Sequence, residues 1–350
     1  MNMNEILTIA ASMKASDVHI AVGNPPNIRS DGALKALDSK ILTKEDTLSY
    51  AQELLTPAQF EVLNQDGQVD LSYRIPDKNA FRINAYKYSG NIGLACRIIS
   101  EDIPTAKELE LPDSIARVAD FVSGLVLVTG PTGCGKSTTI ATIIDAINKK
   151  KNCHILTIED PVEFIHKNDR SIITQREVGR DCKSFEDALR AGLRQDPDVI
   201  MVGEMRDLET ITTALKAAET GHLVLATLHT RNAYQTIERI IDVFPGPQQQ
   251  QIRVQLASSL VAVFSQRLLP RKRGHGRVAA VESLIVSQAV RNLIRENKVH
   301  QMVSFIQTGH KIGMQTMDDY LLGLYRSNTI ERSVLLDNVT DKEAIIKTLG

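Results

Sequence analysis

The stretch LVLVTGPTGCGKSTT, residues 125–139, constrains the fold of this 350-residue chain more than any other feature. It contains the pattern G-x-x-x-x-G-K-[ST] between an apolar run and a helix-like segment, which is where a phosphate-binding loop must stand. Gly130, Gly133 and Gly135 let the backbone turn its N–H groups inward around phosphates, and the N-terminus of the following helix adds partial positive charge. The pattern therefore predicts an α/β domain that binds a nucleotide.

The residues of this loop have separate predicted tasks. Lys136 is expected to reach the β- and γ-phosphates, and Ser137 is expected to ligate Mg²⁺. Cys134 stands where only the backbone is needed, so we interpret it as a tolerated small residue and not as a redox sensor. The remaining predicted nucleotide contacts in the loop are Gly130, Pro131, Thr132, Gly133, Gly135 and Thr138.

Composition narrows the class of protein. The chain has 41 Lys plus Arg against 42 Asp plus Glu, and this balance argues against a strongly basic nucleic-acid footprint. Its apolar runs fall short of the roughly 18 residues that a membrane-spanning helix needs. The start MNMNEILTIAASMK has no basic leader, so a cytoplasmic location is expected. The four cysteines form no CxxC pair, so neither a zinc site nor a disulfide framework is predicted.

The first part of the chain, residues 1–100, predicts a small α+β domain. Its start is amphipathic, and short segments such as DVHIAV and NAFRINAYKY alternate as strands do. The apolar residues at helical spacing in that start are Ile6, Ile9, Ala10 and Met13. The charged segment 101–114 contains two prolines and little apolar periodicity, so it is predicted to be a linker.

Residues 115–269 predict the nucleotide-binding core. Short, nearly continuous apolar runs alternate there with helix-like stretches, and the four clearest runs are LVLVT, HILTIE, DVIMVGE and LVLATLHT. Such runs indicate strands buried on both faces, hence a largely parallel sheet covered by helices. Residues 270–350 read as mostly helical and are predicted to form a separate C-terminal region.

Hydrolysis needs a carboxylate at the end of a neighbouring strand, where it can order Mg²⁺ and the attacking water. Glu204 follows the run Val199–Val202, at the strand end where ligands of open α/β sheets bind. We therefore predict that Glu204 is catalytic and contacts Mg²⁺ through water. Glu159, Asp160 and Glu163 follow another strand; the first two are predicted nucleotide contacts, and the general base is left open between Glu163 and Glu204.

Two histidines stand at the two ends of a fourth predicted strand. His229 ends this strand on the same edge as Glu204, so we predict that it senses the γ-phosphate; an ordinary hydrogen-bonded histidine is the alternative. His222 precedes the strand and is a weaker candidate for a nucleotide contact.

Four motifs, in order and spacing, resemble the Walker A, Asp box, Walker B and His box of the secretion ATPase superfamily, which serves type II and type IV secretion and type IV pili. They are GPTGCGKS, ILTIEDPVEF, DPDVIMVGEMRD and TGHLVLATLHT. The likeness covers essentially the whole chain and includes ASDVHIAVGNPPNIRSDG and FRINAY. Residues 289–296, AVRNLIRE, resemble the segment that marks the pilus retraction branch. Cys134 and Val290 depart from the usual Ser and Ile without disturbing the pattern.

The resemblance implies a cytoplasmic homohexamer that associates peripherally with the inner membrane at the pilus base. Each subunit would join a PAS-like N-terminal domain to a RecA-like ATPase domain, with ATP and Mg²⁺ as cofactors. Hydrolysis would drive pilin disassembly, and thus twitching motility, against the inner-membrane platform protein. The family's arginines that act on the nucleotide across a domain or subunit junction match Arg82 and Arg97. A surface salt bridge is the alternative role for both.

Three other functions stay open. An accessory retraction ATPase of the PilU kind, which could also be a partner, is disfavoured by AVRNLIRE. A type II secretion assembly ATPase usually carries a tetracysteine zinc insert and a long N-terminal platform-binding domain, neither of which is found here. A RecA-type DNA motor is disfavoured by the near-zero net charge and the few aromatic residues. We therefore expect neither nucleic acid nor zinc as a partner.

The segment AVRNLIRE also predicts its own helix faces. Val290, Leu293 and Ile294 fall at i, i+3 and i+4, so they are expected to form a buried stripe. The polar residues should point elsewhere, either as a plain solvated face or as a surface that engages the pilus machine: Arg291, Asn292, Arg295 and Glu296.

Overall fold

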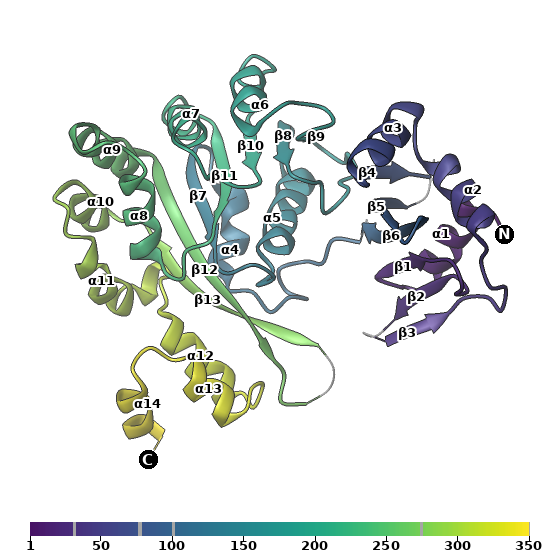
Figure 1. Cartoon of the computed structure of the whole chain (residues 1–350). Helices are drawn as coiled ribbons and strands as arrows, with labels where there is room; N and C mark the ends of the chain where they lie inside the picture. The colour runs from purple at the N-terminus through teal and green to yellow at the C-terminus, as the bar shows by residue number, and fades with distance from the viewer. Residues whose placement is uncertain (31–32, 76–78, 100–101, 274–275, 350) are drawn as a thin grey trace. The chain divides into compact units, whose positions relative to one another are not determined.

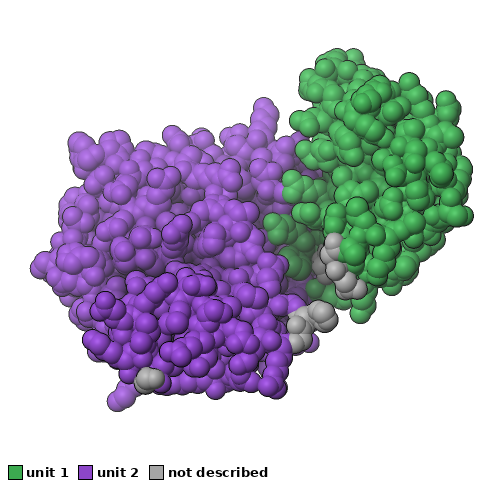
Figure 2. All heavy atoms as spheres, turned by 60° about the horizontal axis from the view of Figure 1, so that its bottom comes forward, with its two compact units in different colours: residues 1–102, 163–165 green, residues 103–162, 166–350 purple. Residues whose placement is uncertain are grey.

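The computed structural model describes residues 1–30, 33–75, 79–99, 102–273 and 276–349, and the chain divides into the two compact units coloured in Figure 2. The first unit is Met1–Asp102 with Glu163–Ile165, and the second is Ile103–Val162 with His166–Gly350. The predicted boundary between residues 100 and 101 lies outside the described residues. Within the described ranges, no helix combines the length and apolar character that a membrane crossing requires.

Among its described residues, the first unit combines an antiparallel sheet of six strands with three helices, which confirms the α+β prediction (Figure 1). The strand order in the sheet is β3-β2-β1-β6-β5-β4. Its strands are β1 (Asp17–Ile20), β2 (Asn27–Ser30), β3 (Ala33–Ala36), β4 (Gln68–Arg74), β5 (Ala80–Tyr88) and β6 (Asn91–Ile99). Its core packs one sheet face against α1 (Met3–Ser12), α2 (Lys44–Leu54) and α3 (Pro57–Asp66).

Helix α1 buries a different stripe from the predicted one. Its buried residues are Met3, Ile6, Leu7 and Ala10. Ile9 is 38% exposed and Met13 is 52% exposed, so the expectation that these two residues belong to the core stripe is wrong. The helix ends at Ser12, which leaves Met13 at its C-cap. Both stripes have helical spacing, and packing against the sheet selects between them.

The second unit is built on a seven-stranded sheet in the order β13-β12-β7-β11-β10-β8-β9. Every neighbouring pair is parallel except β12 with β13, which confirms the prediction of a largely parallel sheet. Its strands are β7 (Gly124–Thr129), β8 (His154–Glu159), β9 (Ile172–Glu177), β10 (Val199–Val202), β11 (Leu223–Leu228), β12 (Leu260–Pro270) and β13 (Arg277–Ile285). Four of these strands are the four predicted runs.

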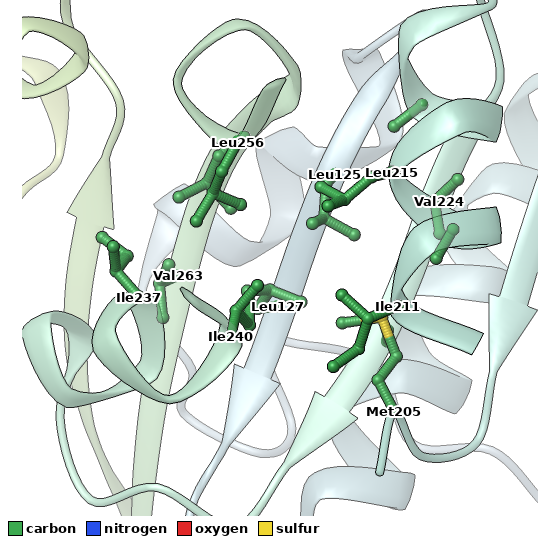
Figure 3. Packing of buried hydrophobic residues seen from close by; sticks show 14 of the residues in the cluster. Leu125, Leu127, Met205, Ile211, Leu215, Val224, Ile237, Ile240, Leu256 and Val263 are labelled. Carbon is green, nitrogen blue, oxygen red and sulfur yellow. The ribbon is translucent and has the colours of Figure 1, made fainter. Parts of the chain in front are cut away.

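Helices cover both faces of this sheet, because its central strands are apolar on both sides. On β7, Leu125 and Leu127 enter one core cluster, while Val126 and Val128 enter the other. The first cluster includes α6 (Phe185–Gly192), α7 (Leu208–Glu219), α8 (Ala233–Asp242), α9 (Gly246–Ser259), α10 (Gln288–Arg295) and α11 (Met302–Thr308). The second includes α4 (Asp113–Ala116), the 3₁₀ turn η1 (Arg117–Asp120) and α5 (Lys136–Lys150). Figure 3 shows Ile211, Leu215, Ile237, Ile240 and Leu256 packed over the strands.

The predicted boundary between residues 269 and 270 falls inside β12, and the sheet continues beyond it into β13. The prediction that residues 270–350 are mostly helical therefore missed one strand. The basic stretch 271–277, of which 274–275 lie outside the described residues, follows β12 and ends at Arg277, the first residue of β13, so it does not separate two domains. The far end of the hairpin packs against α12 (Met317–Arg326), α13 (Arg332–Asn338) and α14 (Lys342–Leu349).

Candidate nucleotide-binding site

The glycine-rich loop runs from the end of β7 to the start of α5, as predicted. Gly130, Gly133 and Gly135 have φ angles of 143°, 76° and 91°, in the left-handed region that other residues adopt only under strain. At Gly130 there is also no room, because a Cβ would lie 2.3 Å from the backbone oxygen of Gln266. The loop thus needs glycine for its conformation and, at Gly130, for its close approach to β12.

Lys136 is buried and directs its ammonium group back into the loop. Its Nζ donates to the carbonyl oxygen of Gly130 at 2.8 Å and to that of Pro131 at 3.2 Å. The same atom lies 3.5 Å from Nδ1 of His229. A positive charge is therefore held among the loop, the first turn of α5 and the end of β11. Ser137, the next residue on α5, is half-buried.

Glu204 joins this group from the neighbouring strand β10. It follows Gly203, whose N–H donates to the carbonyl of Ile158 at 2.8 Å and so keeps the chain beside β8. One carboxylate oxygen of Glu204 lies 3.1 Å from Nε2 of His229, and the other lies 2.7 Å from Nη2 of Arg206. The structure thus brings two predicted residues, Glu204 and His229, together with Lys136 in one connected group.

The electrostatics of Glu204 favour its ionised form. Partial burial by itself raises the pKa of this carboxyl, but the hydrogen bond from Arg206 and the charges of His229 and Arg206 outweigh burial and lower the pKa below its usual value. Each carboxylate oxygen has a second lone pair, so both can still accept a hydrogen bond from water. Glu204 is accordingly charged at neutral pH and able to hold a water molecule.

Sequence reasoning missed Arg206 and Gln266. Arg206 lies two residues after Glu204, a spacing that puts side chains on the same side of an extended segment, and this was the available signal. Gln266 lies in the run LVAVFSQRLL, between Ser265 and Arg267, and is only 3% exposed. Its side chain bonds to Cys134 and Thr139. A buried amide within a strand must find partners, but the sequence does not say which.

Glu159 and Asp160 stand at the carboxyl end of β8, on the same sheet edge as Glu204. Glu159 is buried, and one of its oxygens accepts from Oγ1 of Thr157 at 2.6 Å and from Nε2 of Gln175 at 3.1 Å. Asp160 is exposed and follows directly. Glu163 groups with the first compact unit. Within the second unit, Glu204 is the candidate carboxylate that the structure links to Lys136 through His229.

His222 does not reach this edge. Its Nδ1 lies 2.9 Å from the carbonyl oxygen of Ala217, at the end of α7, and 3.3 Å from Oγ1 of Thr220. The six residues of β11 separate it from His229, a span of about 20 Å. His222 therefore caps the C-terminal end of α7.

Arg82 and Arg97 lie opposite each other on β5 and β6 of the first unit. Their neighbours Phe81, Ile83 and Cys96 are buried in the core, so both arginines occupy the other, exposed face of the sheet. Nε of Arg97 lies 3.0 Å from Oδ1 of Asp17, so the alternative of a surface salt bridge is realised for this residue. The Arg97 side chain nevertheless stays 69% exposed.

Comparisons with known proteins show which family the chain resembles. The family model of the type II/IV secretion system protein matches residues 1–320. The type IV pilus retraction ATPase PilT of Pseudomonas aeruginosa is 46% identical over 99% of both chains. The type IV pilus ATPase PilU of the same organism is 37% identical over 99% of this chain and 92% of its own. A crystal structure of the pilus retraction motor PilT with bound ADP superposes with a TM-score of 0.92, at 48% identity and 99% coverage of both chains.

These matches span both units of this chain. They also cover nearly the full length of each relative, and the two sequence relatives are named as ATPases. The chain therefore belongs to the type II/IV secretion system protein family, and it is one of the PilT-like ATPases in that family.

Proposed function

We propose that this protein hydrolyses ATP to power type IV pilus retraction. The observation that carries the proposal is the connected group Lys136, His229 and Glu204 at the carboxyl edge of the sheet, in a chain 46% identical to a retraction ATPase over its full length. The direct test is whether the purified chain hydrolyses ATP and whether it alone restores twitching to a retraction-deficient strain. An accessory ATPase of the PilU kind would hydrolyse ATP but fail the second test.

The loop suits the phosphates of ATP. Its glycines have positive φ angles, a backbone conformation typical of loops that direct N–H groups at phosphate. The Lys136 ammonium lies among loop carbonyls, from which it can turn to the β- and γ-phosphates. Mg²⁺, which neutralises phosphate charge in such sites, takes oxygen ligands and keeps several waters. The Ser137 hydroxyl would be a direct ligand, and the Glu204 carboxylate would act through water. Both are hard oxygen donors, so the residues fit the ion.

Glu204 is the residue we assign to the attacking water. Its lowered pKa keeps it ionised, and an ionised carboxylate orients water and accepts its proton as the bond to phosphorus forms. His229 contacts Lys136 through Nδ1 and Glu204 through Nε2. Loss of the γ-phosphate would therefore change the contacts of both ring nitrogens. Glu163 remains the alternative base. Glu159 and Asp160 remain proposed contacts at the same edge.

We further propose a homohexamer whose nucleotide sites are completed by Arg82 and Arg97, and which works against the inner-membrane platform protein at the pilus base. The exposure of both arginines on one sheet face supports a role beyond their own unit. A DNA motor is the function from another class, and stimulation of hydrolysis by single-stranded DNA would favour it.

Helix α10 carries the segment AVRNLIRE and has the predicted buried stripe of Val290, Leu293 and Ile294. Arg291 departs from the prediction. Its Nη1 donates to the carbonyl oxygen of Ser258 at 2.7 Å and also to that of Ala257, so it closes the last turn of α9. Asn292, Arg295 and Glu296 are exposed, and Arg295 donates to the side chain of Asn292.

This division predicts two separable variants of α10. The double change Asn292→Ala and Arg295→Ala should leave folding and ATP hydrolysis near wild type, because Ala is a good helix former and the stripe is untouched. Cells carrying it should have pili that they cannot retract, which twitching assays and pilus counts would measure. Normal twitching, or hydrolysis lost together with motility, would refute the separation.

Arg291→Ala is the matched control. It should destabilise the protein by about 1–3 kcal/mol, because two carbonyls at the end of α9 lose a charged donor. Thermal unfolding should show a lower midpoint for Arg291→Ala and a wild-type midpoint for the double variant. This difference distinguishes a residue that stabilises the fold from a surface that engages the pilus machine.

A further inference from the structure

We infer that Gln266 is a positioning residue that presets the phosphate-binding loop. It lies on β12, 132 residues beyond Cys134 in sequence, yet its Nε2 donates to the Cys134 carbonyl oxygen at 2.8 Å. Its Oε1 accepts from Oγ1 of Thr139 at 2.8 Å. One buried side chain thus bonds both to the loop and to the first turn of α5.

The chemistry of the partners fixes the orientation of this amide. A backbone carbonyl can only accept a hydrogen bond, so the NH₂ group must face Cys134. Oε1 is then left for the hydroxyl of Thr139, which can donate. A carboxylate could not replace the amide, since it would turn an acceptor toward the Cys134 carbonyl. The position therefore requires a side chain that donates on one side and accepts on the other.

The bond to Cys134 acts on the phosphate side of the loop through the peptide plane. The Cys134 carbonyl and the Gly135 N–H belong to one planar trans peptide, so they point in opposite directions. Drawing the carbonyl toward β12 aims the Gly135 N–H away from β12, into the loop where phosphate binds. Gln266 would therefore hold one phosphate donor in its binding direction before the nucleotide arrives, which lowers the ordering cost of binding.

The glycines of the loop support this close contact independently. A Cβ on Gly135 would lie 2.9 Å from the Gln266 side-chain nitrogen, and one on Gly130 would lie 2.3 Å from its backbone oxygen. Two of the three loop glycines thus leave room for the same residue of β12. Gly133, by contrast, has open space around it.

The neighbouring residue Ser265 provides a matched control. Its hydroxyl lies 2.9 Å from that of Thr129, a buried contact between β12 and β7 before the loop begins. Ser265→Ala removes a buried hydrogen bond of the same strand without touching the Cys134–Gly135 peptide. A residue that only stabilises the sheet should affect the protein as Ser265 does.

The inference rests on nucleotide binding by the proposed function, and the test is calorimetric titration of the full chain with ADP. Gln266→Leu should weaken ADP binding by about 10- to 100-fold, as expected when a donor to a charged group loses its alignment. Gln266→Glu should weaken it at least as much. Thr139→Val, which frees the amide to turn, should cause a smaller loss. Ser265→Ala should bind ADP as wild type does, with thermal unfolding of every variant measured alongside.

The outcomes separate the two hypotheses. A wild-type chain that fails to bind ADP contradicts the proposed function itself. Wild-type ADP affinity in folded Gln266→Leu overturns the assignment of Gln266 alone, and so does an equal loss in Ser265→Ala at equal thermal stability. Should Gln266→Leu not fold, Thr139→Val decides, because unchanged ADP affinity in that variant would also overturn the assignment.

Discussion

Lys136→Ala is expected to lose most nucleotide affinity and all turnover, whereas Glu204→Gln should keep ATP bound and stall hydrolysis. Lys136 supplies a positive charge that the carbonyl groups of Gly130 and Pro131 hold in place. It is the one charged residue among residues 130–137 of the loop, so no other loop side chain can supply this charge. Glu204→Gln preserves the size of the side chain but removes the charge that orients and deprotonates water. A general base contributes about 10²- to 10⁴-fold to a rate, so the loss should be of that order.

The measurement pairs ATP binding with single-turnover hydrolysis on the same preparations. Arg206→Ala is a useful control, since it removes the other partner of the Glu204 carboxylate and leaves the carboxylate itself. That variant should hydrolyse faster than Glu204→Gln. An equal loss of binding in Lys136→Ala and Glu204→Gln would contradict the separate roles.

Arg82→Ala and Arg97→Ala are each expected to reduce hydrolysis strongly while the proposed hexamer still assembles. An arginine that stabilises transferring phosphate is worth about 10³- to 10⁵-fold in turnover, whereas an exposed salt bridge contributes about 0–1 kcal/mol to stability and nothing to the rate. The two arginines lie opposite each other on an exposed sheet face, where neither side chain is part of the core of its own unit.

Asp17→Asn distinguishes the two roles of Arg97. It removes the charge partner at 3.0 Å and keeps the arginine, so hydrolysis should stay near wild type if Arg97 serves a nucleotide. If Arg97 only forms the surface ion pair, Asp17→Asn and Arg97→Ala should behave alike. Dilution supplies a second check: specific activity that is constant down to monomer concentrations would rule out a site completed by a neighbouring subunit.

The site could be predicted from the sequence where its requirements are local. Gly130, Gly133 and Gly135 adopt backbone angles that other residues disfavour, so glycine at this spacing announces the loop. Glu204 and His229 were expected on one edge because the carboxyl ends of parallel strands meet there, and the structure joins them at 3.1 Å. Both features depend only on residues that are near each other in the chain and on the direction of a strand.

Other features were decided by contacts between distant segments. The sequence of residues 277–285 is compatible with a helix or a strand, and pairing with β12 makes it a strand. Arg291 looks like a surface charge in the sequence, but in the structure it donates to a carbonyl group at the end of α9. In α1, two apolar stripes have the same spacing, and only the sheet chooses Met3 and Leu7 over Ile9 and Met13. Local periodicity states that a face is apolar but not which face a neighbour will cover.

The sequence by itself determined the nucleotide loop, the parallel strands and the residues at their ends. The reason is that the glycine pattern of the loop and the apolar runs of the strands are each contained within a few consecutive residues. Only the tertiary structure decided that Gln266 reaches Cys134 and that Lys136, His229, Glu204 and Arg206 form one connected group. These contacts depend on strand order and register, which bring together residues far apart in the chain. A hydrogen bond needs its two atoms within about 3 Å, and no pattern of residue types along the chain specifies that distance.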